Sequence, residues 1–272
     1  MTTPDSTELP CGCRRGTTPA GAGAAQAPAL QPERFALDTG RIRAIALDLD
    51  DTLWPIWPTI DRAERALLAF LQRHAPQAAE LSRQSGLARE VRHALLAANP
   101  HYAHDLTTLR REMIRTVLLR AGDDPELAEP AFDVFYEERQ RVDFFPDALP
   151  ALEFLSCRFP VVAVSNGNAD VHRVGIGAHF HAAVSARSVG VGKPDARIFH
   201  AAAQAAGVAP HEVLHVGDDA HLDGLGALGA GMQLAWVNRS GEPWPHAPLR
   251  PHAEVRDLAA LCALLGEFSA SS

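Results

Sequence analysis

Lysine is almost absent from this chain, because only one of its 25 basic residues, Lys193, is a lysine. A compact ammonium with three rotatable donors is not interchangeable with the planar guanidinium of arginine. A single lysine can also be an accident of composition, so whether Lys193 is functional has to be judged from the motifs around it. The segment Gly192-Lys193-Pro194 is therefore the first candidate for a functional position.

Other shortages exclude whole classes of protein. The net charge of −8 leaves no broad basic surface, so we expect no nucleic-acid partner. No run of about 18 apolar residues is present, so we expect no membrane span. The four cysteines, Cys11 and Cys13 among them, are too few and too scattered for a disulfide framework. We therefore predict that the protein is located in a reducing compartment, the cytoplasm.

Large apolar side chains are scarce before Leu30, and we predict that residues 1–34 form a disordered tail. The short apolar run 42–47, which ends at Asp48, is typical of a strand buried on both faces. Residues 61–141 change to helical spacing of apolar positions. Beyond that block strands and helices alternate, which favours a parallel sheet with helices on both faces.

The helical block directly follows the first strand, so we interpret it as an insert and a lid. The predicted fold is α/β: a Rossmann-like parallel-sheet core with an inserted, all-helical cap. Its predicted parts are a tail at 1–34, a core domain at 35–57 and 143–272, and a cap domain at 58–142.

Polar motifs stand where the predicted strands end, and ligands of open parallel sheets bind outside those carboxyl ends. A lone aspartate there is usually a cap or turn residue. Four such motifs in this order, each near the end of a predicted strand, are poorly explained as caps and turns alone. The motifs are Asp48-Leu49-Asp50-Asp51-Thr52-Leu53, Ser165-Asn166-Gly167, Gly192-Lys193-Pro194 and Gly217-Asp218-Asp219 with Asp223.

These residue types are the equipment for phosphoryl transfer. Converging carboxylates from Asp48, Asp50 and Asp218 repel one another unless a cation is bound, and an all-oxygen site suits Mg²⁺. Lys193 supplies a positive point charge for an anion or a nucleophilic carboxylate. Ser165 and the backbone N–H groups after it form a donor cradle of phosphate size. A carboxylate nucleophile beside such a pocket can accept a phosphoryl group.

Together the four motifs resemble those of the haloacid dehalogenase superfamily of hydrolases, over roughly residues 41–265. The helical block resembles the C1 cap of subfamily I. The resemblance implies that Asp48 is a nucleophile that forms an aspartyl-phosphate and that Asp50 is the general acid/base. It implies that Ser165 and Asn166 hold phosphoryl oxygens, and that Lys193 neutralises Asp48 and phosphate. The implied metal ligands are Asp48, Asp50 and Asp218, with Asp219 or Asp223 beside the metal or behind its ligands.

A narrower resemblance concerns bacterial flavin-pathway phosphatases, which act on FMN and on 5-amino-6-(5-phosphoribitylamino)uracil, a riboflavin precursor. It covers the motif from Asp48 to Trp54, the cap segment 99–107, Ser165 to Asn168, and 214–219 with 231–233. Enzymes of this type are often promiscuous, and their choice of substrate depends on the cap.

Several side chains have both a functional and a structural interpretation. Four residues of the cap loop are candidates for contact with the substrate, while Asp105 is equally placed to cap the following helix. Trp54 and Trp57 either line the entrance or pack the hinge. The four loop candidates are His101, Tyr102, His104 and Asp105.

We therefore predict a Mg²⁺-dependent phosphatase of small-molecule phosphate esters. One alternative is a 2-haloacid dehalogenase or other hydrolase of this superfamily; dehalogenases need neither a second catalytic aspartate nor a metal, so Asp50 argues against them. A phosphonatase or a sugar phosphomutase is also conceivable. A further alternative is a non-catalytic binding module that keeps the fold, and the complete motif set argues against it. The sequence leaves the physiological substrate and the oligomeric state open.

Overall fold

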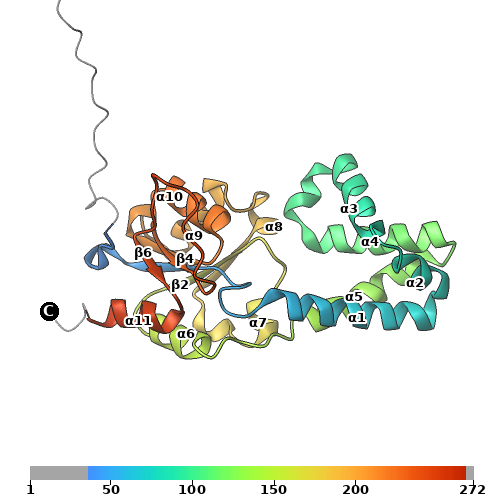
Figure 1. The fold of residues 1–272 in the computed structure, drawn as a ribbon, viewed down its shortest axis with the longest axis horizontal. Coiled ribbons are helices and arrows are strands. Elements are labelled where there is room, and N and C mark those ends of the chain that lie inside the picture. The colour runs from blue at the N-terminus through green and yellow to red at the C-terminus, as the bar shows by residue number, and fades with distance from the viewer. Residues whose placement is uncertain (1–35, 268–272) are drawn as a thin grey trace, which may run out of the picture. The chain divides into compact units, whose positions relative to one another are not determined.

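Six parallel strands form one sheet in the computed structural model, which describes residues 36–267 (Figure 1). The strand order is β3-β2-β1-β4-β5-β6. The first strand therefore lies in the interior of the sheet, between β2 and β4, so that the motifs after these three strands meet at one edge. The strands are β1 (Ala44–Leu47), β2 (Val161–Ser165), β3 (Ala182–Ser185), β4 (Val213–Gly217), β5 (Gln233–Val237) and β6 (Ala253–Val255).

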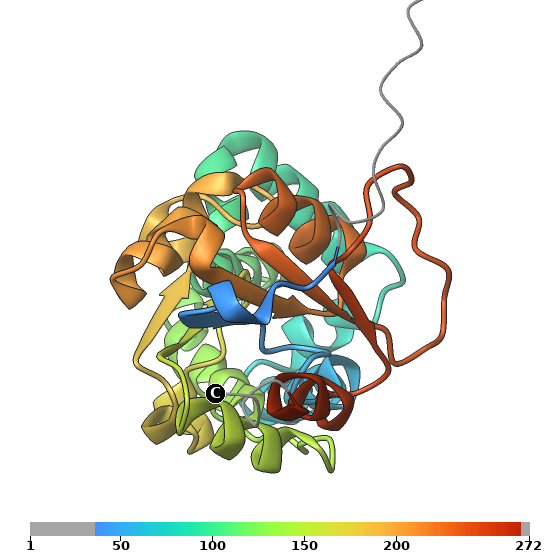
Figure 2. The same ribbon diagram turned by 90° about the vertical axis from the view of Figure 1, so that its left-hand side faces the viewer.

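Alternate residues of the strands enter two different cores, because successive side chains of a strand point to opposite faces. In β1, Ile45 and Leu47 belong to one core and Ala44 and Ala46 to the other. Helices α6 (Ala148–Ser156) and α11 (Leu258–Glu267) pack on the first face. Helices α9 (Ala196–Ala206) and α10 (Gly226–Gly229) pack on the second (Figure 2). The predicted α/β class is confirmed.

Five helices between β1 and α6 form the inserted region and enclose a hydrophobic core of their own. Helix α4 begins after Asp105, whose side chain accepts a hydrogen bond from the Thr108 N–H, and it ends before Gly122, which has positive φ. The inserted helical cap is confirmed, whereas its exact boundaries at 58 and 142 stay a prediction. The helices are α1 (Ile56–His74), α2 (Pro76–Ser82), α3 (Leu87–Ala98), α4 (Leu106–Ala121) and α5 (Ala128–Arg139).

Short helical turns connect the remaining elements. The α-helical ones are α7 (Val171–Val174) and α8 (Ala186–Val189). The 3-10 turns are η2 (Thr39–Arg41), η3 (Pro100–His104), η4 (Pro125–Leu127), η5 (Gly177–His179) and η6 (Pro210–Glu212). No helix in the described part of the chain is long and apolar enough to span a membrane. The predicted tail and its two cysteines lie outside the described residues.

The structure differs from the predicted pattern after β4. The alternation of strands and helices predicts an ordinary α-helix here, but the chain first forms a π-helix, η7 (Ala220–Leu225), and then the short α10. The wide turn arises because the Asp219 carbonyl accepts hydrogen bonds from both the Asp223 and the Gly224 N–H. Such π-turns are often found at functional sites, and this one carries Asp223. Strand β6 and helix α11 were not predicted.

Candidate active site

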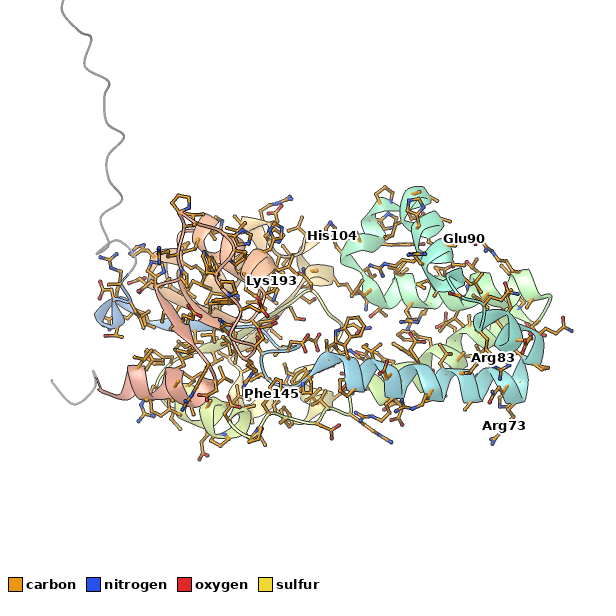
Figure 3. The ribbon with its side chains drawn as sticks, viewed as in Figure 1. Arg73, Arg83, Glu90, His104, Phe145 and Lys193 are labelled. Carbon is orange, nitrogen blue, oxygen red and sulfur yellow. The ribbon has the colours of Figure 1, made fainter. Side chains whose placement is uncertain are left out.

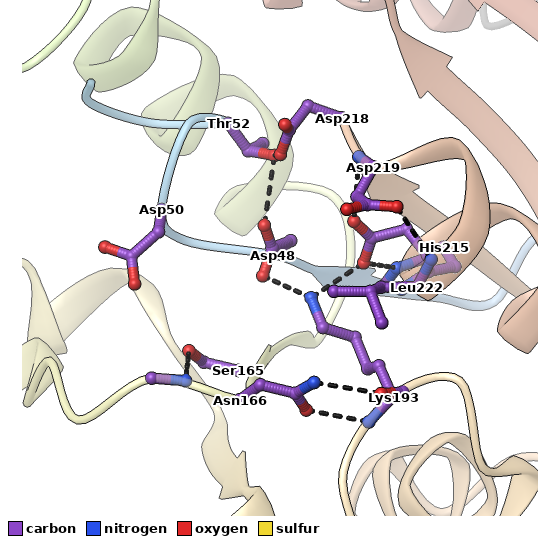
Figure 4. Close-up of polar contacts among 12 residues, drawn as sticks. Asp48, Asp50, Thr52, Ser165, Asn166, Lys193, His215, Asp218, Asp219 and Leu222 are labelled. Atoms are coloured by element: carbon purple, nitrogen blue, oxygen red, sulfur yellow. Dashed lines mark hydrogen bonds and ion pairs between the residues drawn. The ribbon is translucent and has the colours of Figure 1, made fainter. Parts of the chain in front are cut away.

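The carboxylate of Asp48 lies at the carboxyl end of β1, where it meets the only lysine of the chain (Figure 4). Lys193 Nζ contacts Asp48 Oδ1 and also lies 2.7 Å from Asp223 Oδ1. All three side chains are at least nine-tenths buried. The ammonium therefore joins two carboxylates from different segments, one directly after β1 and the other in the π-helix after β4.

Asp223 is held from three sides. Besides Lys193, His215 of β4 lies with Nε2 2.8 Å from Asp223 Oδ1, and the Asp219 N–H donates to Asp223 Oδ2 at 3.1 Å. Asp219 itself is exposed, and its side chain accepts from the N–H groups of His221 and Leu222, so that it caps the π-helix. Of the two candidates that the sequence left ambiguous, Asp223 is the one that faces the other carboxylates.

Asp218 completes a group of three carboxylates. Oxygens of Asp48, Asp218 and Asp223 all lie within 4.8 Å of one another. Thr52, which is fully buried, donates its hydroxyl proton to Asp218 Oδ1 at 3.0 Å, with Asp48 Oδ2 3.4 Å away. The Trp236 indole N–H donates to the Asp218 carbonyl and fixes the backbone at this point. These contacts place three carboxylates around one small volume.

The electrostatics of this group show a shortage of positive charge. Burial raises the pKa of Asp48, and Asp223 and Asp218 add to that effect against Lys193. Burial and Asp223 raise the pKa of Asp218 to about 7. Burial would also raise the pKa of Asp223, but Lys193 and His215 outweigh it and lower the value to about 2. One ammonium among three carboxylates leaves room for a cation, and the all-oxygen set suits a hard divalent ion such as Mg²⁺.

Asp50 lies apart from this group. Its Oδ1 accepts a hydrogen bond from the Trp54 indole at 2.8 Å, and Arg139 Nη2 lies 2.8 Å from Oδ1 and 2.7 Å from Oδ2. Figure 4 shows Asp50 on the side of Asp48 away from His215. Trp54 is fully buried and its ring packs edge-on against Phe144, which is the hinge-packing arrangement. The oxygens of Asp50 are thus not among the three carboxylates that converge.

The loop after β2 lines the same cavity as Asp48, Lys193 and Asp218. Ser165 Oγ accepts from the Gly167 N–H at 2.9 Å. The side chain of Asn166 is engaged with the backbone of Lys193, donating to its carbonyl at 2.9 Å and accepting from its N–H at 2.7 Å. Asn166 therefore positions the lysine with its carboxamide, and only its backbone is left for the predicted contact with a phosphoryl oxygen.

The cap-loop candidates fall into two groups. His104 and Asp105 line a cavity of about 290 Å³ together with Ser165, Gly167 and Tyr136, whereas His101 and Tyr102 do not. Figure 3 shows His104 at the side of the inserted helices that is nearer to Lys193. Asp105 caps α4 and also forms an ion pair with Arg187. The exposed Trp57 does not line this cavity.

Sequence reasoning did not assign roles to Arg139, His215 or Thr52. Thr52 stands inside the first motif, and the spacing of four from Asp48 was a usable signal. His215 precedes the Gly217-Asp218 motif by two residues on a predicted strand, so a buried histidine at the site could have been proposed. Arg139 is 89 residues from Asp50 in sequence, and no local pattern indicates that they meet.

Comparisons with known proteins agree with this geometry. The family described as haloacid dehalogenase-like hydrolases matches residues 42–231. The 5-amino-6-(5-phospho-D-ribitylamino)uracil phosphatase of Escherichia coli K12 is 35% identical over 85% of this chain and 100% of its own length. The phosphoserine phosphatase of Thermus thermophilus is 32% identical over 74% of this chain and 91% of its own. The resemblance to flavin-pathway phosphatases and the predicted enzyme class are confirmed.

A solved structure shows the same fold. The crystal structure described as a 2-haloacid dehalogenase from Pseudomonas syringae superposes with a TM-score of 0.79 at 37% identity, covering 84% of this chain and 99% of that one. The family match extends over well more than half of the chain and includes all four motifs. The protein belongs to the haloacid dehalogenase-like hydrolases.

Proposed function

We propose that this chain is a Mg²⁺-dependent phosphatase, which hydrolyses a small-molecule phosphate monoester through a covalent phosphate on Asp48. One observation carries the proposal: a single cavity of about 160 Å³ is lined by every group that the reaction needs. Since a water molecule takes about 30 Å³ of liquid, this cavity has room for a phosphoryl group. The lining includes Asp48, Asp50, Ser165, Asn166, Gly167, Lys193, Asp218 and Asp223.

The residues fit a divalent cation. Asp48 and Asp218 would hold it, with Asp223 at the edge of the set because it is already paired with Lys193. The chemistry that bound Mg²⁺ supplies is neutralisation of negative charge at Asp48 and at the phosphoryl oxygens. The Asp50 carboxylate is engaged by Arg139 and Trp54, so we assign that side chain to proton transfer instead of metal binding.

The side chains then divide the work. Lys193 opposes the effect of burial and favours the carboxylate form of Asp48, which attacks phosphorus and forms the acyl phosphate. Ser165 and the backbone after it donate to the phosphoryl oxygens. Asp50 protonates the leaving alcohol and afterwards takes a proton from the water that hydrolyses the acyl phosphate. The inserted helices cover the site and exclude bulk water during these steps.

The leaving group of the substrate would occupy the 290 Å³ cavity. That cavity shares Ser165 and Gly167 with the phosphate loop and extends to Tyr136 and Arg187. An aromatic ring and a guanidinium suit a heterocycle that carries hydroxyl groups. The substrates we propose are 5-amino-6-(5-phosphoribitylamino)uracil and FMN, and the likeness to the Escherichia coli phosphatase supports them.

A phosphate-release screen tests the proposal. FMN, the ribitylaminouracil phosphate, phosphoserine, sugar phosphates and nucleotides are each assayed with Mg²⁺ and with EDTA. We expect phosphate release that needs Mg²⁺ and is fastest with one of the two flavin-pathway compounds. Absence of release from every ester, or activity unchanged by EDTA, would contradict the metal-dependent mechanism.

The structural neighbour from Pseudomonas syringae makes a dehalogenase the second candidate. A dehalogenase also uses an aspartate nucleophile, but Asp50 and the carboxylate cluster would then have no task. Halide release from 2-chloropropionate in the presence of EDTA separates the two activities. Halide release without any phosphate release would replace our proposal by this one, and neither activity would favour a binding module.

A further inference from the structure

Arg139 is the last residue of α5, where the chain leaves the inserted helices and returns to the sheet. Its side chain is 2% exposed, and Nη2 donates to both carboxylate oxygens of Asp50. No other arginine or lysine in the described part of the chain forms an ion pair with Asp50. The acid of the proposed reaction is therefore in contact with the end of the insert.

The two donors to Asp50 share one oxygen, Oδ1, but only Arg139 reaches the other, Oδ2. Trp54 donates to Oδ1 only, while Oδ2 has Arg139 as its donor. Oδ2 is also the oxygen that faces the phosphate loop, because a Cβ atom added to Gly167 would lie 2.6 Å from it. The same added atom would lie 3.4 Å from Arg139 Nη2. Arg139 thus holds the oxygen that points toward the place where the phosphoryl group would bind.

The backbone around Arg139 is fixed by the two loops that carry the motifs. The side-chain amide of the next residue, Gln140, donates to the Asn168 carbonyl and accepts from the Asp170 N–H, in the loop after Ser165. A few residues later the Phe145 N–H donates to the carbonyl of Leu53, in the loop of Asp50. These contacts place the guanidinium at a defined point between both loops.

We propose that Arg139 is a positioning residue, which aims Asp50 at the leaving-group oxygen and so couples proton transfer to the end of the inserted helices. This inference rests on the proposed function, because it takes Asp50 as the general acid. Charge-assisted hydrogen bonds are the strong ones, and a small misplacement of a catalytic group is costly. Without Arg139, Asp50 keeps only the indole of Trp54 and is free to turn its Oδ2 away.

The dependence of the rate on the leaving group separates this role from others. General acid catalysis matters most when the leaving alcohol is a poor leaving group, and least for 4-nitrophenol. We would measure kcat/KM for an alkyl phosphate, phenyl phosphate and 4-nitrophenyl phosphate, because kcat/KM includes the departure of the alcohol. The variants are Arg139→Gln, Arg139→Lys, Asp50→Asn and the double variant of Arg139→Gln with Asp50→Asn. The matched control is Arg141→Gln, which changes an exposed arginine of the same segment.

The expected result has three parts. Arg139→Gln loses about 10²-fold in kcat/KM on the alkyl phosphate and less than about tenfold on 4-nitrophenyl phosphate, so the plot against leaving-group pKa becomes steeper. Arg139→Lys, which keeps a charged donor, recovers part of that loss. Arg139→Gln adds little to Asp50→Asn in the double variant, since both remove the same function. The Arg141→Gln control keeps the wild-type rates and slope.

Other outcomes would overturn the inference. Nη1 of Arg139 has no hydrogen-bond partner among residues 36–267, so the guanidinium could instead bind phosphate. An equal loss for all three esters, with weaker inhibition by inorganic phosphate, would show that role. A lower Tm with the wild-type slope would show a purely structural one. In both cases Asp50→Asn still steepens the plot; if it does not, or if no ester is hydrolysed, the proposed function itself fails.

Discussion

Two aspartates that are two residues apart in sequence are held by different parts of the molecule. Asp48 is buried and is in contact with Lys193 and Thr52, from loops at the carboxyl edge of the sheet. Asp50 is partly exposed and is held by Trp54 and by Arg139 of the inserted helices. The environment of the nucleophile is therefore built by the sheet domain alone, whereas that of the acid is complete only when α5 is in place.

Removing the nucleophile is expected to have the largest effect on activity. Asp48→Asn should lose on the order of 10⁴-fold or more in kcat, because an amide cannot form the acyl phosphate. Lys193 keeps Asp223 as its partner, so we expect Tm to stay close to that of the wild type. Asp143→Asn, at an exposed position, is the control. Activity near the wild-type level in Asp48→Asn would contradict the mechanism.

The second prediction concerns the lysine that joins Asp48 to Asp223 in the sheet domain. Lys193→Arg keeps the charge, yet we expect about a 10²-fold loss in kcat, since a planar guanidinium is wider than an ammonium and displaces one carboxylate. Steady-state kcat and KM on the best ester measure the effect. The reverse exchange Arg197→Lys, at an exposed ion pair, should be neutral. A kcat within about threefold of wild type, roughly 0.6 kcal/mol, would make the single lysine a compositional accident.

Gly217 tests how tightly the sheet side is packed. A Cβ atom at this position would lie 2.3 Å from Asp223 Cγ, so Gly217→Ala must move the carboxylate away from Lys193. We expect a loss of about 1–3 kcal/mol in the free energy of unfolding and a clear drop in kcat. In Gly229→Ala the added atom meets nothing within 4 Å, and this variant should keep both values. Equal behaviour of the two variants would argue against close packing at Asp223.

The sheet side was also the part that sequence could predict. Parallel strands bring their carboxyl ends to one edge, so Asp48, Ser165 and Asp218 could be placed together from strand periodicity alone. The lysine could be singled out because it is the only one. The choice between Asp219 and Asp223 could not be made, because it depends on a π-turn instead of the expected α-helix.

The insert side was less accessible to sequence reasoning. The helical block and its position after the first strand were evident from apolar spacing, and the fold confirms them. The contact between Arg139 and Asp50 depends on how α5 returns to the sheet, which is a tertiary property. Arginine is common in this chain, so Arg139 carried no compositional signal of the kind that marked Lys193. Trp54 is a different case: it lies only four residues from Asp50, so this contact was within reach of sequence reasoning, which instead left Trp54 between the entrance and the hinge.

Substitution of Asp105, at the start of helix α4 in the inserted region, is expected to have the smallest effect on stability and activity. Its oxygens accept hydrogen bonds from the N–H and the hydroxyl of Thr108, and Arg187 Nε lies 3.3 Å from Oδ2. These contacts make it a helix cap, so Asp105→Ala should lower the free energy of unfolding by about 1 kcal/mol. Asp105→Asn keeps a capping oxygen and should be nearly neutral, and both variants should keep KM within about twofold by order of magnitude. Thermal unfolding and steady-state kinetics measure both quantities. A several-fold rise of KM in both variants would instead place Asp105 in contact with the substrate, and the insert would then select the leaving group as well as position its acid.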